Sequence, residues 1–584
     1  MANIKFCLSK DGIMTARINL NRRSFFIVSG VAGMTGLLAA CGGNSNTSSA
    51  ETGSALTSGD DISKLVAINE HDRADLQQGG VLNLAVATLG PNFNVATQTG
   101  YTTSNLNVMA AVNTATVSGL WKTNALGEYS VNTDYCTSYE ASETDGVQTI
   151  SIKLNPEAKF NDGTPVDVKA LQVTHKTLTE EGYNIVDPGV YAHIASIEED
   201  GDAFSVKITM TEPYYPIEGL FGTGLVHPAM EDPAIFNDGL LDTINNDYLS
   251  GPYKVDNWDS AQKVLTVVPN ENWWGEKPLL ERITFRQMEA SAARAAFRNG
   301  EIDAVTANSL TAYNDLDGTS GAEPRRGQNL YAGGLVINPE RLTDTALRRA
   351  IFAAIDRQAI AAVRFNGLNW TEVVPGSMML MPFATDYQDN YPTETGAEAA
   401  KKILTDAGYS ESGEYLANSS GNAKFAITTF GDDPVASATA QTIVQQMKAA
   451  GIECTIDNQP DANFSTVIGN KEYDVTVSGY GILGEDASGA AEYFYHSSTY
   501  NGIGTPEIDE MVDRLRTIES MEERNVLSNE IEKKHMAEVA TMAPIFNGPE
   551  IWFCKTKLAN YGAFLFARPY ANPDVYINVG WVKE

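Results

Sequence analysis

The spacing of hydrophobic residues predicts a strand-rich first half of the chain. From Gly79 to about Gln328, short apolar runs such as "QTISIKL", "AFSVKITM" and "KVLTVVP" are separated by Pro- and Gly-containing turns, which is typical of β-strands. The first of these strands lies in "GGVLNLAVATLG", which begins at Gly79. One helix interrupts the strands, and it starts near Val168 with Asp167 as its predicted N-cap.

The second half alternates more regularly between helices and strands. Leu347, Ile351 and Ile355 recur at helical spacing and predict one long helix. "AKFAITTF", "PVASATAQTIVQQMKAA" and "IECTID" then predict a strand, a helix and a second strand, which would form a right-handed unit with parallel strands. "EYDVTVSGYG" predicts the next strand. Two amphipathic helices follow, with Thr505 and Ser520 as their predicted N-caps.

Two adjacent acids, Glu485 and Asp486, follow the strand in "EYDVTVSGYG" within the Gly-rich loop "GYGILGEDASG". They lie just beyond the C-terminal end of a strand, which is where open α/β sheets place ligands. Adjacent side chains point in different directions, whereas the carboxyl groups of an acid–base pair converge on one bond. We therefore predict that these acids border a ligand cleft and are not catalytic.

The N-terminal region has the features of an export signal. "NRRSFF" precedes an apolar run that ends in small residues just before Cys41, and its paired arginines resemble a twin-arginine signal. "LAAC" resembles a bacterial lipobox, in which the cysteine carries the lipid; an ordinary signal followed by an incidental cysteine is the alternative. We predict a signal peptide at 1–40, lipidation at Cys41 and a flexible Gly/Ser/Thr-rich tether at 41–78. The globular part would then lie outside the cytoplasmic membrane, anchored to its outer face or in the periplasmic space.

Composition narrows the classes of function. The formal net charge of −33 would repel phosphate backbones, so we expect no nucleic-acid partner. Beyond the export region only Cys136, Cys454 and Cys554 remain, which gives neither a disulfide framework nor a zinc motif. Sequence signatures of hydrolases, metalloproteases, nucleotide-binding loops and dinucleotide-binding folds are absent. We expect a monomer without metal, cofactor or enzymatic activity.

Five segments in their order resemble the bacterial extracellular solute-binding proteins of family 5, the dipeptide- and oligopeptide-binding lipoproteins of ABC importers. The Phe-x-Asp-Gly-x-Pro block and the Asn-x-x-Trp-Trp-Gly-x-x-Pro turn are the most recognisable of the five. The segments are "KFNDGTPVDVKALQVTHKTL", "YLSGPYKVDNWDSAQKVLTVVPNENWWGEKP", "FRNGEIDAV", "LRRAIFAAIDRQAI" and "NGIGTPEIDEMVDRL".

This resemblance implies an α/β, two-lobed periplasmic-binding-protein-like fold of type II, whose hinge closes the lobes over a ligand cleft. Lobe one would comprise 79–335, with an extra subdomain at about 111–245, and lobe two would comprise 336–548. Residues 549–584 would return to lobe one. The implied function is capture of a small solute, a peptide or a peptide-like molecule, and its delivery to the permease and ATPase of an ABC importer.

The same resemblance raises a question about the ligand. Peptide-binding members have Gly-Trp-x-x-Asp-x-x-Asp-Pro in the loop, and the first Asp holds the α-ammonium group of the peptide. Here Tyr480 takes the aromatic position, Leu483 the position of that first Asp, Asp486 that of the second, and Ala487 that of the Pro. Leucine cannot accept a hydrogen bond, and an unpaired buried ammonium costs several kcal/mol. Either Glu485 or Asp486 replaces the missing acid, or the ligand is not a free-amino peptide.

Several alternatives therefore stay open. Members of the resembled family also take metal chelates, haem, sugars or opines. A surface lipoprotein hydrolase on the same scaffold, and a sensor that reports ligand occupancy to a membrane receptor, are further possibilities. The residues we expect to line the ligand site in each case are Asn92, Phe93, Asn94, Trp370, Tyr480, Glu485 and Asp486.

Overall fold

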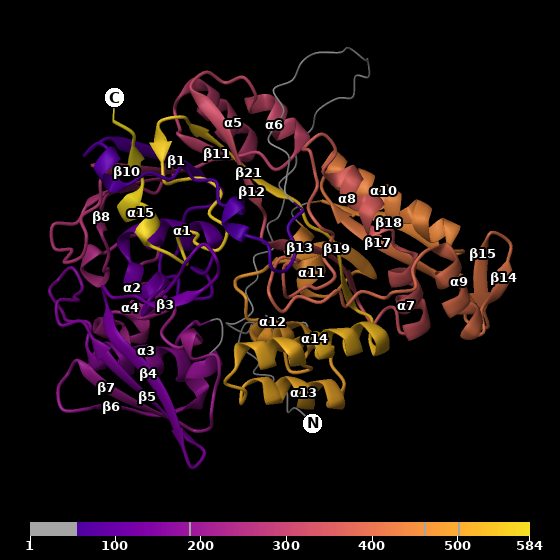
Figure 1. The fold of residues 1–584 in the computed structure, drawn as a ribbon, viewed down its shortest axis with the longest axis horizontal. Helices are drawn as coiled ribbons and strands as arrows, with labels where there is room; N and C mark the ends of the chain where they lie inside the picture. Colours follow the sequence, from indigo (N-terminus) through magenta and orange to yellow (C-terminus); the bar gives the residue numbers. More distant parts are fainter. Residues whose placement is uncertain (1–54, 186–188, 461–462, 500–502, 584) are drawn as a thin grey trace, which may run out of the picture.

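A computed structural model describes residues 55–185, 189–460, 463–499 and 503–583. The predicted signal peptide and Cys41 lie outside the described residues. Two halves stand side by side and are joined by segments of the chain that cross between them (Figure 1). No helix in the described ranges is both long enough and apolar enough to cross a membrane.

The first half, lobe one, is built on a seven-stranded sheet. Its first strand pairs in parallel with strands that come about two hundred residues later in the chain, and it buries Leu82 and Leu84 in the lobe-one core. The sheet includes one strand from the end of the chain. In order, its strands are β12 (Ala322–Gln328), β21 (Pro549–Lys555), β11 (Ala304–Thr306), β1 (Val81–Val86), β10 (Arg282–Gln287), β9 (Val264–Pro269) and β8 (Tyr253–Asp259).

A second, four-stranded antiparallel sheet forms a separate layer of lobe one. Asp167 caps the helix beside it by accepting a hydrogen bond from the backbone of Lys169, as the sequence predicts. Near this sheet a short hairpin projects from the lobe. The sheet order is β4 (Cys136–Thr144), β5 (Val147–Leu154), β7 (Ser205–Met210) and β6 (Ile194–Glu199), and the hairpin is β2 (Trp121–Thr123) with β3 (Tyr129–Val131).

Lobe two contains a five-stranded sheet covered by helices on both faces. The predicted strand–helix–strand unit is confirmed, because β17 and β18 run parallel and α10 connects them. Leu335 and Ile427 pack on one helical layer, and Val336 and Met542 on the other. The sheet order is β18 (Glu453–Gln459), β17 (Lys424–Phe430), β19 (Val475–Gly481), β13 (Tyr331–Ile337) and β20 (Met542–Phe546).

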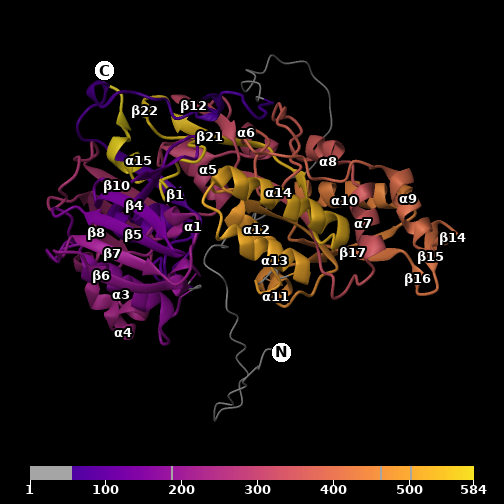
Figure 2. The ribbon, with the colours of Figure 1, turned by 60° about the horizontal axis from the view of Figure 1, so that its bottom comes forward.

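The helices of the two lobes and the remaining small strands complete the fold (Figures 1 and 2). The helices of lobe one are α1 (Thr103–Val112), α2 (Thr114–Val117), α3 (Val168–Thr179), α4 (Pro233–Asp238), α5 (Ala290–Asn299), α6 (Leu310–Leu316) and α15 (Asp574–Asn578). Those of lobe two are α7 (Thr345–Ala354), α8 (Arg357–Arg364), α9 (Ala397–Asp406), α10 (Pro434–Ala449), α11 (Phe464–Gly469), α12 (Ser488–Tyr495), α13 (Pro506–Leu515) and α14 (Met521–Glu538). The small strands are β14 (Ser410–Ser412), β15 (Tyr415–Asn418), β16 (Gly421–Asn422), β22 (Leu558–Ala559) and β23 (Gly580–Trp581).

The long helix predicted around Ile351 is wrong, since the structure has two helices there. α7 ends before Ile355, whose backbone is extended, and Asp356 then caps α8 by accepting a hydrogen bond from the backbone of Ala359. The apolar spacing continues through the break, but the aspartate side chain competes for the backbone donors and starts a new helix.

The prediction of an amphipathic second helix after Ser520 also needs correction. Ser520 does cap α14 through the backbone of Glu523, but polar side chains are buried along the helix together with Leu527 and Ile531. α12 and α13 pack against one side of α14 (Figure 2), and its other side, which includes Val526, Glu530 and Lys533, is exposed. The buried polar side chains of α14 are Arg524, Asn525, Ser528, Asn529, Glu532 and His535.

The chain crosses between the lobes at two adjacent places. The first crossing lies at Asn329, between β12 and β13, so the predicted lobe boundary at 335/336 falls inside a lobe-two strand. The second lies at Asn547 and Gly548, between β20 and β21. Asn547 fastens the two crossings together, because its side-chain amide donates to the carbonyl oxygens of Asn329 (2.7 Å) and Tyr331 (2.6 Å).

The end of the predicted tether is packed and is not a free linker. Leu65 and Leu76 are buried, and Ala67 pairs with Ala563 in a short antiparallel bridge. The packed body therefore begins by residue 55 and not at Gly79. Composition suggested a linker because Gly, Ser and Asp are frequent here, but the few leucines in this segment find apolar partners only in the folded protein.

Candidate functional site

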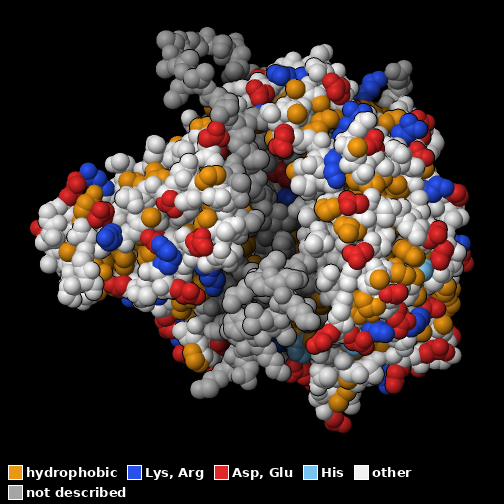
Figure 3. Space-filling view, turned by 180° about the vertical axis from the view of Figure 1, so that it is seen from behind, with side chains coloured by type: hydrophobic (Ala, Val, Ile, Leu, Met, Phe, Trp, Pro, Cys, Tyr) orange, Lys and Arg blue, Asp and Glu red, His pale blue; other side chains and the backbone are white. Residues whose placement is uncertain are grey.

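The loop that follows β19 lies where the two lobes approach each other. A methyl group placed on Gly127 of the β2–β3 hairpin would lie 3.3 Å from Cγ of Glu485, and one on Gly484 would lie 3.4 Å from the hydroxyl of Tyr129. The hairpin belongs to lobe one and the loop to lobe two. Viewed from behind, the described residues form two masses that stand side by side (Figure 3). The loop therefore borders the space between the lobes.

Glu485 carries a carboxylate that is only partly satisfied within the protein. Its Oε1 atom is buried and has no hydrogen-bond partner, while the backbone N–H of Thr385 bonds to the carboxyl group. Burial raises the pKa of this side chain to about 7, and the nearby charge of Asp386 adds to the rise. A cationic group placed beside Glu485 would satisfy the unbonded oxygen and favour the ionised form.

Asp486, in contrast, is already bonded on both of its oxygens. Oδ2 forms an ion pair with Arg524 at 2.5 Å, and Oδ1 accepts hydrogen bonds from the backbone (2.9 Å) and hydroxyl (2.5 Å) of Ser488. The exposed fractions of the two paired side chains are 11% for Asp486 and 4% for Arg524. Asp486 thus fixes the loop onto α14 and the start of α12.

Lobe one contributes two residues to this region that the sequence does not single out. The pKa of Tyr129 is raised to about 12 by burial and by the charges of Asp486 and Glu218, so the hydroxyl stays protonated and can donate a hydrogen bond. Burial also raises the pKa of Glu218. The backbone of Tyr215 donates to the carbonyl of Arg516 at 2.8 Å, which ties lobe one directly to lobe two. Tyr129 lies in a short strand and Glu218 in a short 3₁₀ helix, neither within a sequence motif, and only the folded chain brings them to Asp486.

The charges that meet here are mainly negative. Lobe two contributes the acids Asp386, Glu485 and Asp486, and lobe one contributes Glu218. Arg524 is a cation in this region, which pairs with Asp486 and interacts electrostatically with Glu218. The arrangement suits a ligand with a positively charged group. Leu483 and Tyr129 are each 45% exposed, so apolar and aromatic surface adjoins the acids, while the hydroxyl end of Tyr129 is the enclosed part of that side chain.

The predicted first-lobe contacts are enclosed in the core. Phe93 is fully buried and packs edge-on against Trp258, and the side-chain amide of Asn94 donates to the carbonyl of Phe236 at 2.8 Å. Asn92 is buried as well, and its amide bonds to the carbonyl of Asn237. These side chains hold their loop in lobe one, so their burial does not support the prediction that they line a pocket.

The two predicted aromatic contacts also have structural partners. Trp370 stacks on Phe365 and donates its ring N–H to the carbonyl of Asn547 at 2.9 Å, which places it at the crossing between the lobes. Tyr480 is 7% exposed and packs edge-on against Phe494 of α12. Of the residues expected at the site, the structure brings Glu485 and Asp486 together with Tyr129, while Trp370 lies at the crossing and Phe93 lies in the core.

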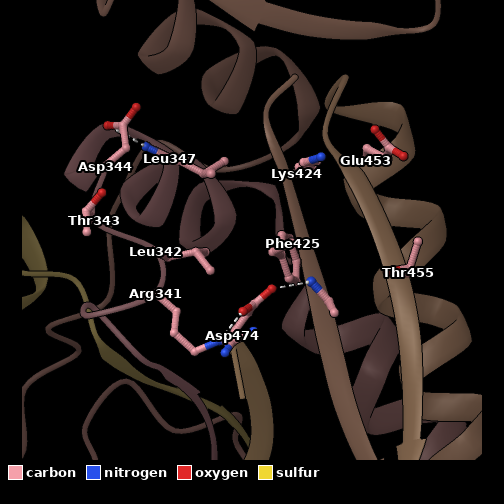
Figure 4. A pocket seen from close by; sticks show the side chains of 11 residues that line it. Arg341, Leu342, Thr343, Asp344, Leu347, Lys424, Phe425, Glu453, Thr455 and Asp474 are labelled. Carbon is pink, nitrogen blue, oxygen red and sulfur yellow. Dashed lines mark hydrogen bonds and ion pairs between the residues drawn. The ribbon is translucent and has the colours of Figure 1, made fainter. Parts of the chain in front are cut away.

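A separate surface pocket of about 520 Å³ lies on lobe two (Figure 4). Lys424 and Glu453 are the first residues of their parallel strands, so this pocket is at the opposite end of the sheet from the Glu485 loop. Asp474 at its base already accepts hydrogen bonds from Arg341 (2.7 Å) and from the backbone of Ala426 (3.0 Å). Within the described ranges, no group of three or more His, Cys, Asp or Glu side chains could hold a metal ion.

Comparison with known proteins gives the same family as the sequence motifs. Residues 131–502 match the family model described as bacterial extracellular solute-binding proteins, family 5 middle. The oligopeptide-binding protein OppA of Mycobacterium tuberculosis is 28% identical over 508 residues, which cover 85% of this chain and 84% of that protein. The probable D,D-dipeptide-binding periplasmic protein DdpA of Escherichia coli is 25% identical over 61% of this chain and 66% of that protein.

Solved structures confirm the predicted fold class. The periplasmic EDTA-binding protein EppA superposes with a TM-score of 0.79 at 23% identity, covering 90% of this chain and 100% of that one. The oligopeptide-binding protein AppA of Bacillus subtilis, solved with a nonapeptide, gives a TM-score of 0.68 at 19% identity, covering 87% of this chain and 100% of that one.

Proposed function

Since the chain belongs to the family 5 bacterial extracellular solute-binding proteins, we propose that it captures a peptide or peptide-like solute outside the membrane and delivers it to an ABC importer. The length of the match to OppA and the likeness to AppA with its nonapeptide support a peptide. A lipid at Cys41 would keep the protein at the membrane surface, beside the permease and its ATPase. The family is one of solute-binding proteins, so the alternative of a hydrolase has no support.

The observation that carries the proposal is the meeting of the Glu485 loop with the β2–β3 hairpin. In a two-lobed binding protein, side chains at such a junction contact the ligand when the lobes close. We propose that Glu485 holds a cationic group of the ligand, and that Tyr129 and Leu483 contact its uncharged part. Asp486 acts indirectly, because its bonds to Arg524 and Ser488 set the position of the loop.

A non-peptide ligand is the second candidate, and Leu483 is the observation that favours it. Relatives that bind free-amino peptides have an acid at this position, whereas here the side chain is a leucine that is 45% exposed. The solved relatives of this fold include the EDTA-binding protein EppA and NikZ of Campylobacter jejuni in complex with Ni(L-His). A cationic or amphipathic solute other than a peptide would also use Glu485.

The first test is mass spectrometry of the solute that leaves the purified protein on denaturation. Peptides with free N-termini would support the peptide assignment, and a chelate, sugar or other small molecule would replace it with the second candidate. Absence of any released solute, together with no binding of a peptide library or of metal chelates in calorimetry, would contradict the proposal of a solute-binding function.

The second test examines Glu485 with the solute identified in this way. Glu485→Gln keeps the shape of the side chain and removes its charge, so we expect at least a tenfold loss of affinity for a cationic solute, the scale of one charge-assisted bond. Glu128→Gln is the matched control, since Glu128 is an exposed acid of the β2–β3 hairpin opposite the Glu485 loop, and it accepts a hydrogen bond from Asn124 of its own turn. Equal affinity of both variants would exclude Glu485 as the cation-binding residue.

A further inference from the structure

The segment that precedes β1 contacts both lobes. On the lobe-one side, Ala67 pairs with Ala563, and the guanidinium of Arg325 donates to the carbonyls of Ile68 (3.2 Å) and Tyr561. Gly327 of β12 lies so close to the segment that an added methyl group would be 2.4 Å from the carbonyl oxygen of Leu65. This end of the segment is thereby fixed to lobe one next to the first crossing.

The other end of the segment reaches lobe two. The hydroxyl of Ser58 donates to the carbonyl of Thr385 at 3.1 Å. Leu56 and Leu65 are 8% and 4% exposed, and they belong to an apolar cluster that also contains Phe383 and Phe566. Phe383 comes from lobe two, while Phe566 comes from the C-terminal segment that packs on lobe one, and their rings make an edge-on contact.

Local bonds give the segment a defined shape between its two ends. The side chain of Asp60 accepts from the backbone (2.8 Å) and hydroxyl (3.1 Å) of Thr57, which closes a turn. Asp61 caps the short 3₁₀ helix Ile62–Leu65 through the backbone and hydroxyl of Ser63. Because these residues are already ordered, they can hold the two ends at a fixed separation at a smaller entropic cost than a disordered linker.

Thr385 links the segment to the candidate ligand site. Its carbonyl accepts from Ser58, and its backbone N–H bonds to the carboxyl group of Glu485. A displacement of residues 55–58 would therefore move the residue that holds the side chain we assign to the ligand. These contacts connect the N-terminal segment to the site through Thr385 of lobe two.

We propose that residues 55–66 act as a strap that holds lobe two against lobe one beside the ligand site. The proposal rests on the proposed function, because opening of the lobes is what admits and releases the solute. A lipid on Cys41 would place the start of the strap within about 50 Å of the membrane, the length of the intervening residues when fully extended. Tension on the strap at the membrane would then weaken its hold on the Thr385 loop, and the lobes would open more readily where the permease is.

Hydrogen exchange of the full-length mature protein tests the strap without a ligand. Leu56→Ala removes apolar contact at the lobe-two end, so we expect backbone amides at residues 383–387 to exchange about tenfold faster and the radius of gyration in X-ray scattering to rise. Leu76→Ala is the matched control, because Leu76 is also buried but packs with Leu279 and Ala559 of lobe one. This variant should leave exchange at 383–387 unchanged.

Ser58→Ala is the second variant, since it removes one hydrogen bond without leaving a cavity and keeps the protein folded. It should accelerate exchange at 383–387 about threefold. Unchanged exchange in both Leu56→Ala and Ser58→Ala, or equal acceleration by Leu76→Ala, would overturn the strap. Neither result depends on whether mass spectrometry finds a bound solute, so failure of the strap is distinguishable from failure of the proposed function.

Discussion

Replacing Asp486 with alanine should destabilise lobe two, although the sequence predicts Asp486 only as a loop residue that borders a ligand cleft. The substitution leaves the guanidinium of Arg524, which is 4% exposed, without its carboxylate partner. It also removes the acceptor for the backbone and hydroxyl of Ser488 at the start of α12. The loss therefore affects both the ion pair and the N-terminus of a helix.

The magnitude follows from burial and from the partners that remain. Breaking a buried ion pair by removing one member costs about 3–5 kcal/mol. Arg524 keeps the carbonyls of Ile518 (2.8 Å) and Glu519 (2.6 Å) as acceptors, so the lower end of that range applies to the pair. The lost bonds to Ser488 add about 1 kcal/mol. We expect about 3–4 kcal/mol in total.

Differential scanning calorimetry at neutral pH measures this loss. For a unit the size of one lobe, about 1 kcal/mol lowers the midpoint by about 2–4 °C, so the transition of lobe two should move down by roughly 6–16 °C. The two lobes need not unfold together, and hydrogen exchange of α12 and α14 assigns the transition. Glu398→Gln is the control, because Glu398 is 88% exposed in its pair with Lys401 and should change stability little.

A double variant separates the charge from the packing. Asp486→Leu with Arg524→Met replaces the pair by apolar side chains and should be less destabilising than Asp486→Ala alone, since no unpaired buried charge remains. The reasoning is refuted if Asp486→Ala shifts the midpoint no more than Glu398→Gln does. That result would mean that solvent reaches Arg524 of α14 freely.

Three further outcomes follow from single side chains. The folded pKa of Glu485, about 7, lies above its ordinary value of 4.5, so the folded state binds more protons than the unfolded state between these pH values. The free energy of unfolding should therefore fall by about 1–3 kcal/mol as pH rises from 4.5 through 7. Glu485→Gln should flatten the matching decline in melting temperature. Burial lowers the pKa of His535 from 6.5 to about 3, so the stability present above pH 6.5 is lost on acidification, by about 2 kcal/mol at pH 5. His535→Gln should therefore show a smaller drop in melting temperature between pH 7 and pH 5. Leu483→Asp restores the acid of peptide-binding relatives and should raise the affinity for free-amino peptides at least tenfold in calorimetry but not for their N-acetylated forms; equal gains for both would contradict an ammonium contact.

Local pattern was sufficient for much of the fold. The strand, helix and strand at 424–459, the N-caps Asp167, Thr505 and Ser520, and the order of the family motifs are properties of neighbouring residues, and the structure contains each of them. The division of one predicted helix at Ile355 was missed because the apolar spacing continues across it. The buried polar side chains of α14 were missed because their partners lie in distant loops.

The candidate site divides in the same way. The sequence by itself determined that an acidic, Gly-rich loop follows β19 and that Leu483 stands where the family motif, by resemblance, would have an acid, since both depend on consecutive residues. Only the tertiary structure decided which acid is already bonded within the protein and which keeps an unbonded oxygen. Asp486 is paired with Arg524 of α14, whereas Glu485 keeps a buried oxygen without a partner. The physical reason is that burial, ion pairing and the approach of Tyr129 depend on residues far apart in the chain, whose distances are set by packing and not by spacing in the sequence.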